Sequence, residues 1–300
     1  MKILVILNSD AGRRSSPDRE TRTEEIITAF QAVHVEAAVE CPGGPDLTAF
    51  TKKALGSGFD AVVAAGGDGT ISAVAAALVG TPIPLGILPL GTLNHLAKDL
   101  KISFDLQEAV RTIAEGKVRA IDVGEVNGRV FVNNSSIGLH PRAVRKRNQE
   151  IIRLGRRKWP AMLDASLRVF LRFPLITIRL ETPGGGLTRT TPFLFVGNNR
   201  YDMKFLRIGD RPSLEGGELC AYLLKTTGRL ALLRIMLLGI LGLKHDRDFA
   251  SLLTREVQVR TRRKRITVSA DGQLFTLETP LHYRIRPKAL RVLAPEAEKP

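Results

Sequence analysis

The chain has 300 residues, of which 44% are hydrophobic and 25% charged, a composition typical of a folded protein of about two domains. Lys and Arg outnumber Asp and Glu by 45 to 30, and the formal net charge of +15 admits polyanions, acidic lipid surfaces and phosphorylated substrates as partners. The two cysteines, Cys41 and Cys220, have no zinc-type spacing and exclude a disulfide framework, which favours a reducing compartment.

Up to about Val123 the pattern alternates strands and helices. Strands are expected at Ile3–Leu7, Val35–Glu40, Ala61–Ala65 and Leu85–Leu88, and helices at Arg22–Val33, Asp46–Leu55 and Thr70–Leu78. Short apolar strands separated by helices favour parallel pairing in a doubly wound sheet. Ligands on such sheets bind beyond the carboxyl ends of the strands, so the loops that follow the strands are the candidate site.

After Asp122 the pattern changes to many short strands with turn signals, which is typical of a sandwich-like domain. Strands are expected at Arg129–Asn133, Leu175–Glu181, Pro192–Val196, Leu219–Leu224, Val257–Arg260, Ile266–Ala270 and Leu281–Ile285, and helices at Pro141–Phe170 and Gly228–Leu243. We therefore predict an α/β domain over residues 1–123 and a β-rich domain over residues 124–300, whose last strand can return to the first domain.

The strongest local signal is the run Gly66, Gly67, Asp68, Gly69 and Thr70 between an apolar strand and a helix. Glycines let the backbone approach an anion, and the start of the helix offers free N–H groups and a positive dipole end. An acidic residue inside a phosphate loop makes sense if it holds Mg²⁺ or orients the loop through hydrogen bonds. The alternative is a plain strand-to-helix turn with the aspartate as a cap.

A second turn of the same kind follows the next strand. Gly91, Thr92 and Asn94 precede a short helical pattern, and two such turns on neighbouring strands would face each other across a nucleotide. Asn8 and Gly12, which follow the first strand, could add a third wall to the site.

A third candidate lies in the β-rich half, where Asp271 and Gly272 follow the strand Ile266–Ala270. A carboxylate fixed at the end of a strand can accept the proton of a hydroxyl group, as aspartate does in kinases. The alternative is a simple hairpin turn, because Asp-Gly is a favoured turn dipeptide.

In combination these motifs resemble the diacylglycerol kinase catalytic family, which includes bacterial lipid kinases and is related to sphingosine kinases. The resemblance runs from about residue 2 to about residue 293. It rests on Asn8 with Gly12, Gly66–Thr70, Pro89–Asn94, Phe131–Asn134 with Gly138, and Asp271 with Gly272. It implies two domains with ATP in the cleft between them.

By position, the resemblance implies a role for each motif. Gly66, Gly67, Asp68, Gly69 and Thr70 would contact the phosphates of ATP, with Thr92 and Asn94 completing the nucleotide site. Asp68 would meet the Mg²⁺ that accompanies ATP, and Asp271 would be the general base, so the expected cofactors are ATP and Mg²⁺.

The chain departs from the family pattern in three places. Ser9 and Ala11 stand where the family usually has Pro and Ser in the first loop. The family's Asp-Gly-x-Leu turn, which helps to hold a structural Mg²⁺, is replaced by a run in which only Glu215 or Glu218 could serve as the metal ligand. Gln273 replaces a glutamate two residues after the expected base.

Partners are predicted from the basic segments. The stretch from Arg142 to Lys158 mixes cationic and apolar residues, which favours peripheral contact with an anionic membrane, although a solvated helix face would look the same. A second cluster, Arg260–Arg265, is either a charged hairpin or a contact for phosphate or a lipid headgroup. Because aromatic residues are only 5% and no basic run is interleaved with them, nucleic acid is not expected.

The sequence thus predicts a cytoplasmic, peripherally membrane-associated ATP-dependent kinase that phosphorylates a hydroxyl of diacylglycerol or a similar lipid. Two alternatives stay open: a kinase of a small soluble substrate, similar to nicotinamide-dinucleotide kinases, and a nucleotide-binding regulatory protein without catalysis. The sequence does not decide which lipid is the acceptor or which oligomer forms.

Overall fold

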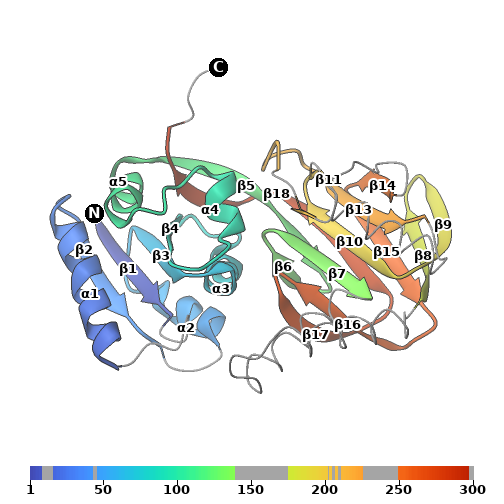
Figure 1. Cartoon of the computed structure of the whole chain (residues 1–300), viewed down its shortest axis with the longest axis horizontal. Coiled ribbons are helices and arrows are strands. Elements are labelled where there is room, and N and C mark those ends of the chain that lie inside the picture. Colours follow the sequence, from blue (N-terminus) through green and yellow to red (C-terminus); the bar gives the residue numbers. More distant parts are fainter. Residues whose placement is uncertain are drawn as a thin grey trace, which may run out of the picture. The chain divides into compact units, whose positions relative to one another are not determined.

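The computed structural model describes residues 1–8, 16–42, 46–138, 175–201, 203–204, 207–208, 211–225 and 249–296. The chain divides into two compact units: Met1–Val123 together with Arg286–Pro300, and Gly124–Ile285. The first is a mixed α/β unit, and the described part of the second consists of strands (Figure 1). The predicted fold class is therefore confirmed, whereas the helices expected at Pro141–Phe170 and Gly228–Leu243 lie outside the described residues.

A parallel sheet forms the centre of the first unit. Its strands are β1 (Lys2–Leu7), β2 (Glu36–Glu40), β3 (Ala61–Gly66) and β4 (Leu85–Pro89), in the order β2-β1-β3-β4. The last part of β18 (Leu281–Ala294) lies parallel to β4, and β5 (Lys117–Val126) pairs with β18. Every residue of β3 and β4 is buried, as expected for strands covered on both faces.

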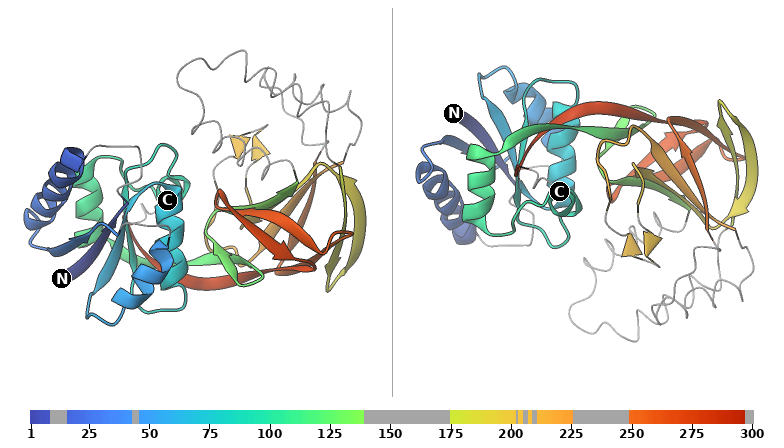
Figure 2. Two further views of the ribbon diagram at one scale, coloured as in Figure 1. Left: turned by 90° about the horizontal axis from the view of Figure 1, so that it is seen from below. Right: turned by 90° about the horizontal axis from the view of Figure 1, so that it is seen from above.

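Helices cover both faces of this sheet (Figure 2). α1 (Ser16–Gln31) and α5 (Leu106–Glu115) lie together on one face, and α2 (Leu47–Ala54) and α3 (Asp68–Leu78) lie together on the other. Aspartate caps fix two of the helix starts: Asp46 accepts a hydrogen bond from the Ala49 amide, and Asp105 accepts one from the Glu108 amide. The doubly wound arrangement expected from the sequence is present.

The strand order determines where a ligand can bind. The chain moves outward from β1 to β2 and then in the opposite direction through β3 and β4, so the direction reverses between β1 and β3. Leu7 pairs with Ala65, and Gly66 pairs with Pro89. The loops after β1, β3 and β4 therefore emerge side by side at the carboxyl edge, where open α/β sheets bind their ligands.

The second unit is a sandwich of antiparallel strands. One layer has the order β14 (Phe249–Thr254), β13 (Leu219–Leu224), β10 (Phe193–Asn198), β7 (Asn134–Gly138), β16 (Arg265–Ala270) and β17 (Gln273–Glu278). The other contains the first part of β18, β15 (Glu256–Thr261), β8 (Ile176–Thr182) and β9 (Gly185–Thr191). A common core of alternate apolar side chains joins the layers, for example Leu194 of β10 and Val257 of β15.

Part of the outer face of the six-stranded layer, over β10 and β13, is apolar as well. Phe195, Cys220 and Tyr222 point away from the sandwich core and pack with Tyr201 in a second cluster. Two short pieces of strand, β11 (Met203–Lys204) and β12 (Arg207–Ile208), form a separate pair.

Several expected boundaries were wrong. The helix expected from Thr70 begins at Asp68, so Asp68 and Gly69 belong to its first turn. The strand expected over Arg129–Asn133 ends at Phe131 as β6 (Arg129–Phe131), because residues 132 and 133 turn into β7. The strand expected over Leu281–Ile285 continues to Ala294.

Further elements were not anticipated, among them α5, β5, β7, β9 and β14. β9 carries Gly and Thr residues and is mostly exposed, so it lacks the apolar alternation that marks a strand. α4 (His95–Asp99) is a short helix after the second glycine-containing turn. Within the described ranges, no helix is both long and apolar enough to cross a bilayer.

Candidate functional site

The glycine-rich run after β3 is tightly folded onto itself. Gly67 is the N-cap of α3, and its carbonyl oxygen accepts hydrogen bonds from the amides of Thr70 and Ile71 at 2.9 and 3.0 Å. A Cβ at Gly66 would lie 2.5 Å from the Thr70 hydroxyl oxygen, so only glycine fits there. Gly69 is exposed, and the first turn of α3 opens to solvent with the amide groups that bind anions at helix starts.

Asp68 uses both carboxylate oxygens to hold the second loop. Oδ2 accepts a hydrogen bond from the Asn94 amide at 3.0 Å, and Oδ1 accepts one from the His95 amide at 2.7 Å. The side chain therefore caps the start of α4, which has no capping side chain of its own. The sequence left open whether Asp68 holds Mg²⁺ or orients the loop through hydrogen bonds. The observed hydrogen bonds are those of a residue that orients the loop.

The two loops touch through their backbones. The Leu90 amide donates to the Gly66 carbonyl at 3.0 Å, and a Cβ at Gly91 would lie only 2.4 Å from the Gly67 Cα. Gly91 is thus required by the close approach of the two turns rather than by its own dihedral angles. The two glycine-containing turns thus lie together, as expected, but in direct contact, and a nucleotide between them stays a prediction.

Asn94 and Thr92 differ in their surroundings. Asn94 is fully buried with φ +47°, and its Nδ2 donates to the Gly91 carbonyl at 2.9 Å, so its side chain holds the turn from inside. Thr92 is exposed and can reach a ligand directly. Of the pair expected to complete the nucleotide site, only Thr92 presents its side chain to solvent.

The loop after β1 joins the same edge. The Asn8 amide donates to the Ala65 carbonyl at 3.1 Å, and its Nδ2 donates to the Thr70 hydroxyl at 3.0 Å. Thr70 is only 2% exposed, so its hydroxyl links the first loop to the second. Gly12 lies outside the described residues.

Asp271 stands in the second unit at a two-residue turn between β16 and β17. Its φ is +46° and that of Gly272 is +79°, and Ala270 pairs with Gln273, which matches a type I′ hairpin turn. The turn interpretation is thus correct, but it is only part of the role of Asp271.

The Asp271 carboxylate is fixed by three backbone amides from residues 132–134. Oδ2 accepts from the Val132 amide at 2.8 Å, and Oδ1 accepts from the Asn133 and Asn134 amides at 2.8 and 3.1 Å. The Asp271 amide returns a hydrogen bond to the Asn134 carbonyl at 2.9 Å. Hydrogen bonds to a carboxylate are shorter and stronger than neutral ones, so its orientation is held firmly.

Gly138, which the resemblance groups with Phe131–Asn134, is required by the local geometry. It adopts φ +96°, and a Cβ there would lie 2.3 Å from the Pro192 carbonyl oxygen. The motif thus combines amides that hold Asp271 with a glycine that lets β7 lie against the start of β10. The carbonyls of Val132 and Asn133 accept hydrogen bonds from three residues that the sequence did not identify: Arg211, Asn198 and Tyr201. Nothing in the spacing of these three residues indicates that they contact this segment.

The proposed structural metal ligands are less organised. Glu215 is exposed, and the amide of Glu218 lies 3.5 Å from the Asn199 Oδ1 in the turn before β13. Nowhere in the described ranges do three His, Cys, Asp or Glu side chains gather in a way that could hold a metal ion. A structural metal at Glu215 or Glu218 stays a prediction.

Two titratable groups belong to the outer apolar cluster. Burial raises the pKa of the Cys220 thiol, and it raises the pKa of the Tyr222 hydroxyl as well. Tyr222 accepts a hydrogen bond from the Tyr201 amide at 3.0 Å and donates one to the Tyr201 carbonyl at 2.9 Å. Both groups are therefore neutral at physiological pH.

The basic cluster Arg260–Arg265 connects β15 to β16. Arg260 pairs with Glu181 at 2.8 Å, and Arg265 pairs with Glu278 at 2.8 Å. The cluster stands at one end of β16 and Asp271 follows the other end, so six residues, or about 20 Å, separate them. The hairpin interpretation of this cluster fits the structure, and a contact of the cluster with phosphate or a lipid headgroup stays a prediction.

A cavity of about 220 Å³ lies beside this cluster. Apolar Ile176 and Ile266 line it together with Arg262 and Arg263.

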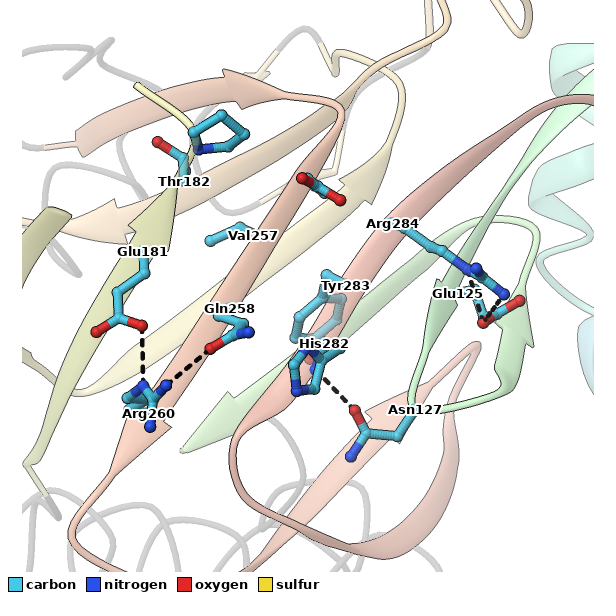
Figure 3. A pocket seen from close by; sticks show the side chains of 12 residues that line it. Glu125, Asn127, Glu181, Thr182, Val257, Gln258, Arg260, His282, Tyr283 and Arg284 are labelled. Atoms are coloured by element: carbon cyan, nitrogen blue, oxygen red, sulfur yellow. Dashed lines mark hydrogen bonds and ion pairs between the residues drawn. The ribbon is translucent and has the colours of Figure 1, made fainter. Parts of the chain in front are cut away.

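A larger groove of about 620 Å³ lies over β15 and β18 and contains none of the predicted site residues (Figure 3). Its cations are paired within it, Arg260 with Glu181 and Arg284 with Glu125, so it presents little excess charge to a ligand.

The comparison with protein families matches the part of the chain that contains these loops. Residues 2–126 match the family model of the diacylglycerol kinase catalytic domain. The matched segment contains both glycine-rich turns and Asn8, and it ends before Asp271.

Relatives and solved structures extend the comparison. The chain is 36% identical over 136 residues to the diacylglycerol kinase of Bacillus subtilis (strain 168), covering 43% of this chain and 43% of that protein. It is 35% identical over 136 residues to a diacylglycerol kinase of Staphylococcus saprophyticus, covering 45% of this chain and 44% of that protein. The matches thus span less than half the length of these relatives.

The fold is shared more widely than the sequence. A crystal structure of a diacylglycerol kinase from Bacillus anthracis str. Sterne is similar with a TM-score of 0.69, covering 98% of this chain and 96% of that one at 20% identity. At this identity the likeness shows the fold alone.

Proposed function

We propose that this protein is an ATP-dependent lipid kinase that transfers the γ-phosphate of ATP to a hydroxyl group of diacylglycerol or a similar lipid. The observation that carries the proposal is the pair of glycine-containing turns inside the diacylglycerol kinase catalytic domain, held backbone to backbone at Gly67 and Gly91. The relatives from Bacillus and Staphylococcus are named diacylglycerol kinases, which supports a lipid as the acceptor.

ATP would bind with its phosphates at the loop Gly66–Thr70. The missing side chain at Gly69, where a Cβ would meet nothing within 4 Å, leaves room for phosphate oxygens at the first turn of α3, whose amides and dipole favour negative charge. Thr92, exposed on the neighbouring loop, supplies a hydroxyl donor. The side chains of Asn8, Thr70 and Asn94 would act indirectly, because they bond the three loops to one another.

Mg²⁺ bound to ATP would neutralise phosphate charge, the contribution that metal ions make to phosphoryl transfer. Asp68 fits as a single carboxylate contact for such an ion, because a carboxylate oxygen that accepts one amide hydrogen bond retains capacity for a further interaction. One protein carboxylate with phosphate oxygens and waters is an ordinary Mg²⁺ environment.

Asp271 would accept the proton of the lipid hydroxyl as that oxygen attacks the γ-phosphorus. Its turn and three amide donors hold the carboxylate in one orientation, which is what a general base requires. Because phosphoryl transfer depends mainly on positioning and charge neutralisation, no covalent intermediate on the protein is needed.

Lipid access would occur at an anionic membrane surface. The formal charge of +15 supports this part of the proposal. The basic stretch Arg142–Lys158, on which the expectation mainly rests, lies outside the described residues. Sedimentation with anionic vesicles at low and high salt tests it: salt-sensitive co-sedimentation is expected, and absence of binding at low salt would remove this step.

The decisive experiment is incubation with labelled ATP, Mg²⁺ and a panel of acceptors in mixed micelles. The panel contains diacylglycerol, monoacylglycerol, a sphingoid base and a set of soluble nucleosides and sugars. Label on a lipid supports the proposal and names the acceptor. Label on a soluble compound would replace it with a metabolite kinase, and ATP binding without transfer to any acceptor would indicate a regulatory nucleotide-binding protein.

A further inference from the structure

A buried arginine lies behind the peptide groups that hold Asp271. Arg211 is 6% exposed, and its Nη1 donates to the Val132 carbonyl at 2.6 Å. Its Nη2 donates to the Asn133 Oδ1 at 3.2 Å, and its guanidinium lies over the Tyr201 ring, 5.5 Å from the centroid. A buried arginine is rare unless its charge is compensated, so the hydrogen-bond partners of Arg211 indicate its role.

The hydrogen bonds of Arg211 and Asp271 meet in one peptide group. The carbonyl of Val132 and the amide of Asn133 belong to the same planar unit, whose C=O and N–H point in opposite directions. Arg211 donates to the carbonyl at 2.6 Å, and the amide donates to Asp271 Oδ1 at 2.8 Å. The cation and the carboxylate are thus linked through one peptide group, and each hydrogen bond polarises the other.

The Val132 carbonyl also accepts a hydrogen bond from the Asn198 Nδ2 at 2.9 Å, and the next peptide group is held by neutral donors. The Asn133 carbonyl accepts from the Tyr201 hydroxyl at 2.9 Å and from the Asn198 amide at 3.0 Å. The amide of the same group, that of Asn134, donates to Asp271 Oδ1 at 3.1 Å. Both peptide groups that donate to Oδ1 are therefore held from the carbonyl side by residues of a separate chain segment.

We propose that Arg211 is a positioning residue for the base: it fixes and polarises the Val132–Asn133 peptide group and thereby sets the orientation and proton affinity of the Asp271 carboxylate. The inference rests on the proposed function for its kinetic consequence. The structural part of the inference is independent of the proposed function, because the hydrogen-bond chain from Arg211 to Asp271 lies wholly within the second unit.

The first test is spectroscopic and needs no activity. In ¹⁵N-labelled protein, the Asn133 amide proton should resonate downfield because it donates to a carboxylate, and Arg211→Met should move it upfield. Arg284→Met is the control: Arg284 also pairs with a carboxylate of the second unit, and its Nε and Nη2 both lie within 2.9 Å of Glu125 Oε1. An Asn133 shift in R211M no larger than in R284M overturns the proposal.

The second test separates chemistry from binding. R211M should lower kcat by about 10- to 100-fold, the usual effect of deleting a hydrogen bond to or from a charged group, while KM for ATP changes less than about twofold. R284M should retain parental kcat. Arg211→Lys should recover part of the loss, because one ammonium can reach the Val132 carbonyl but cannot hold two acceptors in a fork.

A double variant shows whether Arg211 acts through Asp271. D271N/R211M should be no slower than D271N alone, because a positioning residue has nothing to position once the base is gone. Losses that multiply in the double variant would contradict the proposal. If R211M does not fold, the spectroscopic comparison is made with R211K, in which a shift of the Asn133 amide is expected and an unchanged amide overturns the proposal.

The two tests distinguish failure of this inference from failure of the proposed function. If the parent protein phosphorylates no lipid, the kinase proposal fails, and the Asn133 amide shift still decides whether Arg211 is coupled to Asp271. If the parent is active and the amide shift is absent, the positioning role alone is lost.

Discussion

Asp68 and Asp271 perform the same structural task in the two units. Each points its carboxylate at backbone amides of a second segment and so holds two pieces of chain together. Asp68 reaches amides 26 and 27 residues further along the chain, whereas Asp271 reaches amides 137 to 139 residues before it. Both aspartates were predicted from the sequence as site residues, and in the structure both also hold chain segments together through hydrogen bonds.

The difference lies in what surrounds each carboxylate. Asp68 begins a helix beside two glycine-lined loops, so its neighbours are amides and open backbone that suit phosphate. Asp271 is fixed at a turn with φ +46° and is backed by buried side chains that include a cation. The first arrangement favours binding an anion, and the second favours holding one carboxylate still.

The largest effect is expected at Asp271. Asp271→Asn keeps the size of the side chain but removes the proton acceptor, and turnover should fall by about 10²- to 10⁴-fold. Affinity for ATP should stay within about twofold, because no nucleotide loop is touched. Initial rates in mixed micelles and ATP titration by calorimetry measure the two quantities. A variant with parental turnover would remove Asp271 as the base, and a thermal melt checks that the hairpin still folds.

Asp68→Asn should act on binding rather than on turnover at saturating ATP. The amide side chain cannot accept both backbone N–H groups, and it is a poorer partner for Mg²⁺ than a carboxylate. Affinity for ATP with Mg²⁺ should fall by at least about tenfold, and affinity for metal-free ATP by only a few fold. Equal losses with and without Mg²⁺ would leave Asp68 with the loop-holding role alone.

Gly91→Ala tests whether the two loops must touch. Its Cβ would lie 2.4 Å from the Gly67 Cα, and relief of such overlap typically costs about 1–3 kcal/mol. Because the loops would have to separate, ATP affinity should fall by about tenfold. Gly56→Ala is the control, since a Cβ there meets nothing within 4 Å. Unchanged ATP binding in G91A would show that the close approach is dispensable for the site.

The smallest effect is expected at the far end of the strand that leads to Asp271. Arg262, Arg263 and Lys264 lie about 20 Å from the Asp271 turn, given the six residues of β16. Replacing all three by Ala should change kcat on micellar lipid by less than about twofold. A loss comparable to that of D271N would show that this hairpin contacts the substrate after all.

Much of the first unit followed from the sequence. Continuous apolar strands such as Ala61–Ala65 have a pattern that only a sheet covered on both faces satisfies. The expected position of a ligand site at the carboxyl edge followed from the alternation of strands and helices. The starts of α2 and α3 were predicted to within two residues, because caps such as Asp46 are local in sequence, whereas α1 begins at Ser16, six residues before the expected Arg22.

The second unit was predictable as a class but less so in detail. β9 was missed because an exposed edge strand needs no apolar alternation, and β18 was cut short because its alternation of buried and exposed residues breaks at residues 286–289. The turn at Asp271 was recognised from its dipeptide, since both residues of a type I′ turn have positive φ.

By itself the sequence determined the alternation of strands and helices up to β4, the glycine-lined loops and the identity of the two aspartates, because short-range chemistry encodes all of these. Only the tertiary structure decided that Asp68 holds Asn94 and that Asp271 holds residues 132–134, and that Arg211 stands behind that segment. These hydrogen bonds join residues 26 to 138 positions apart, so they depend on strand pairing and packing, and no local pattern records them.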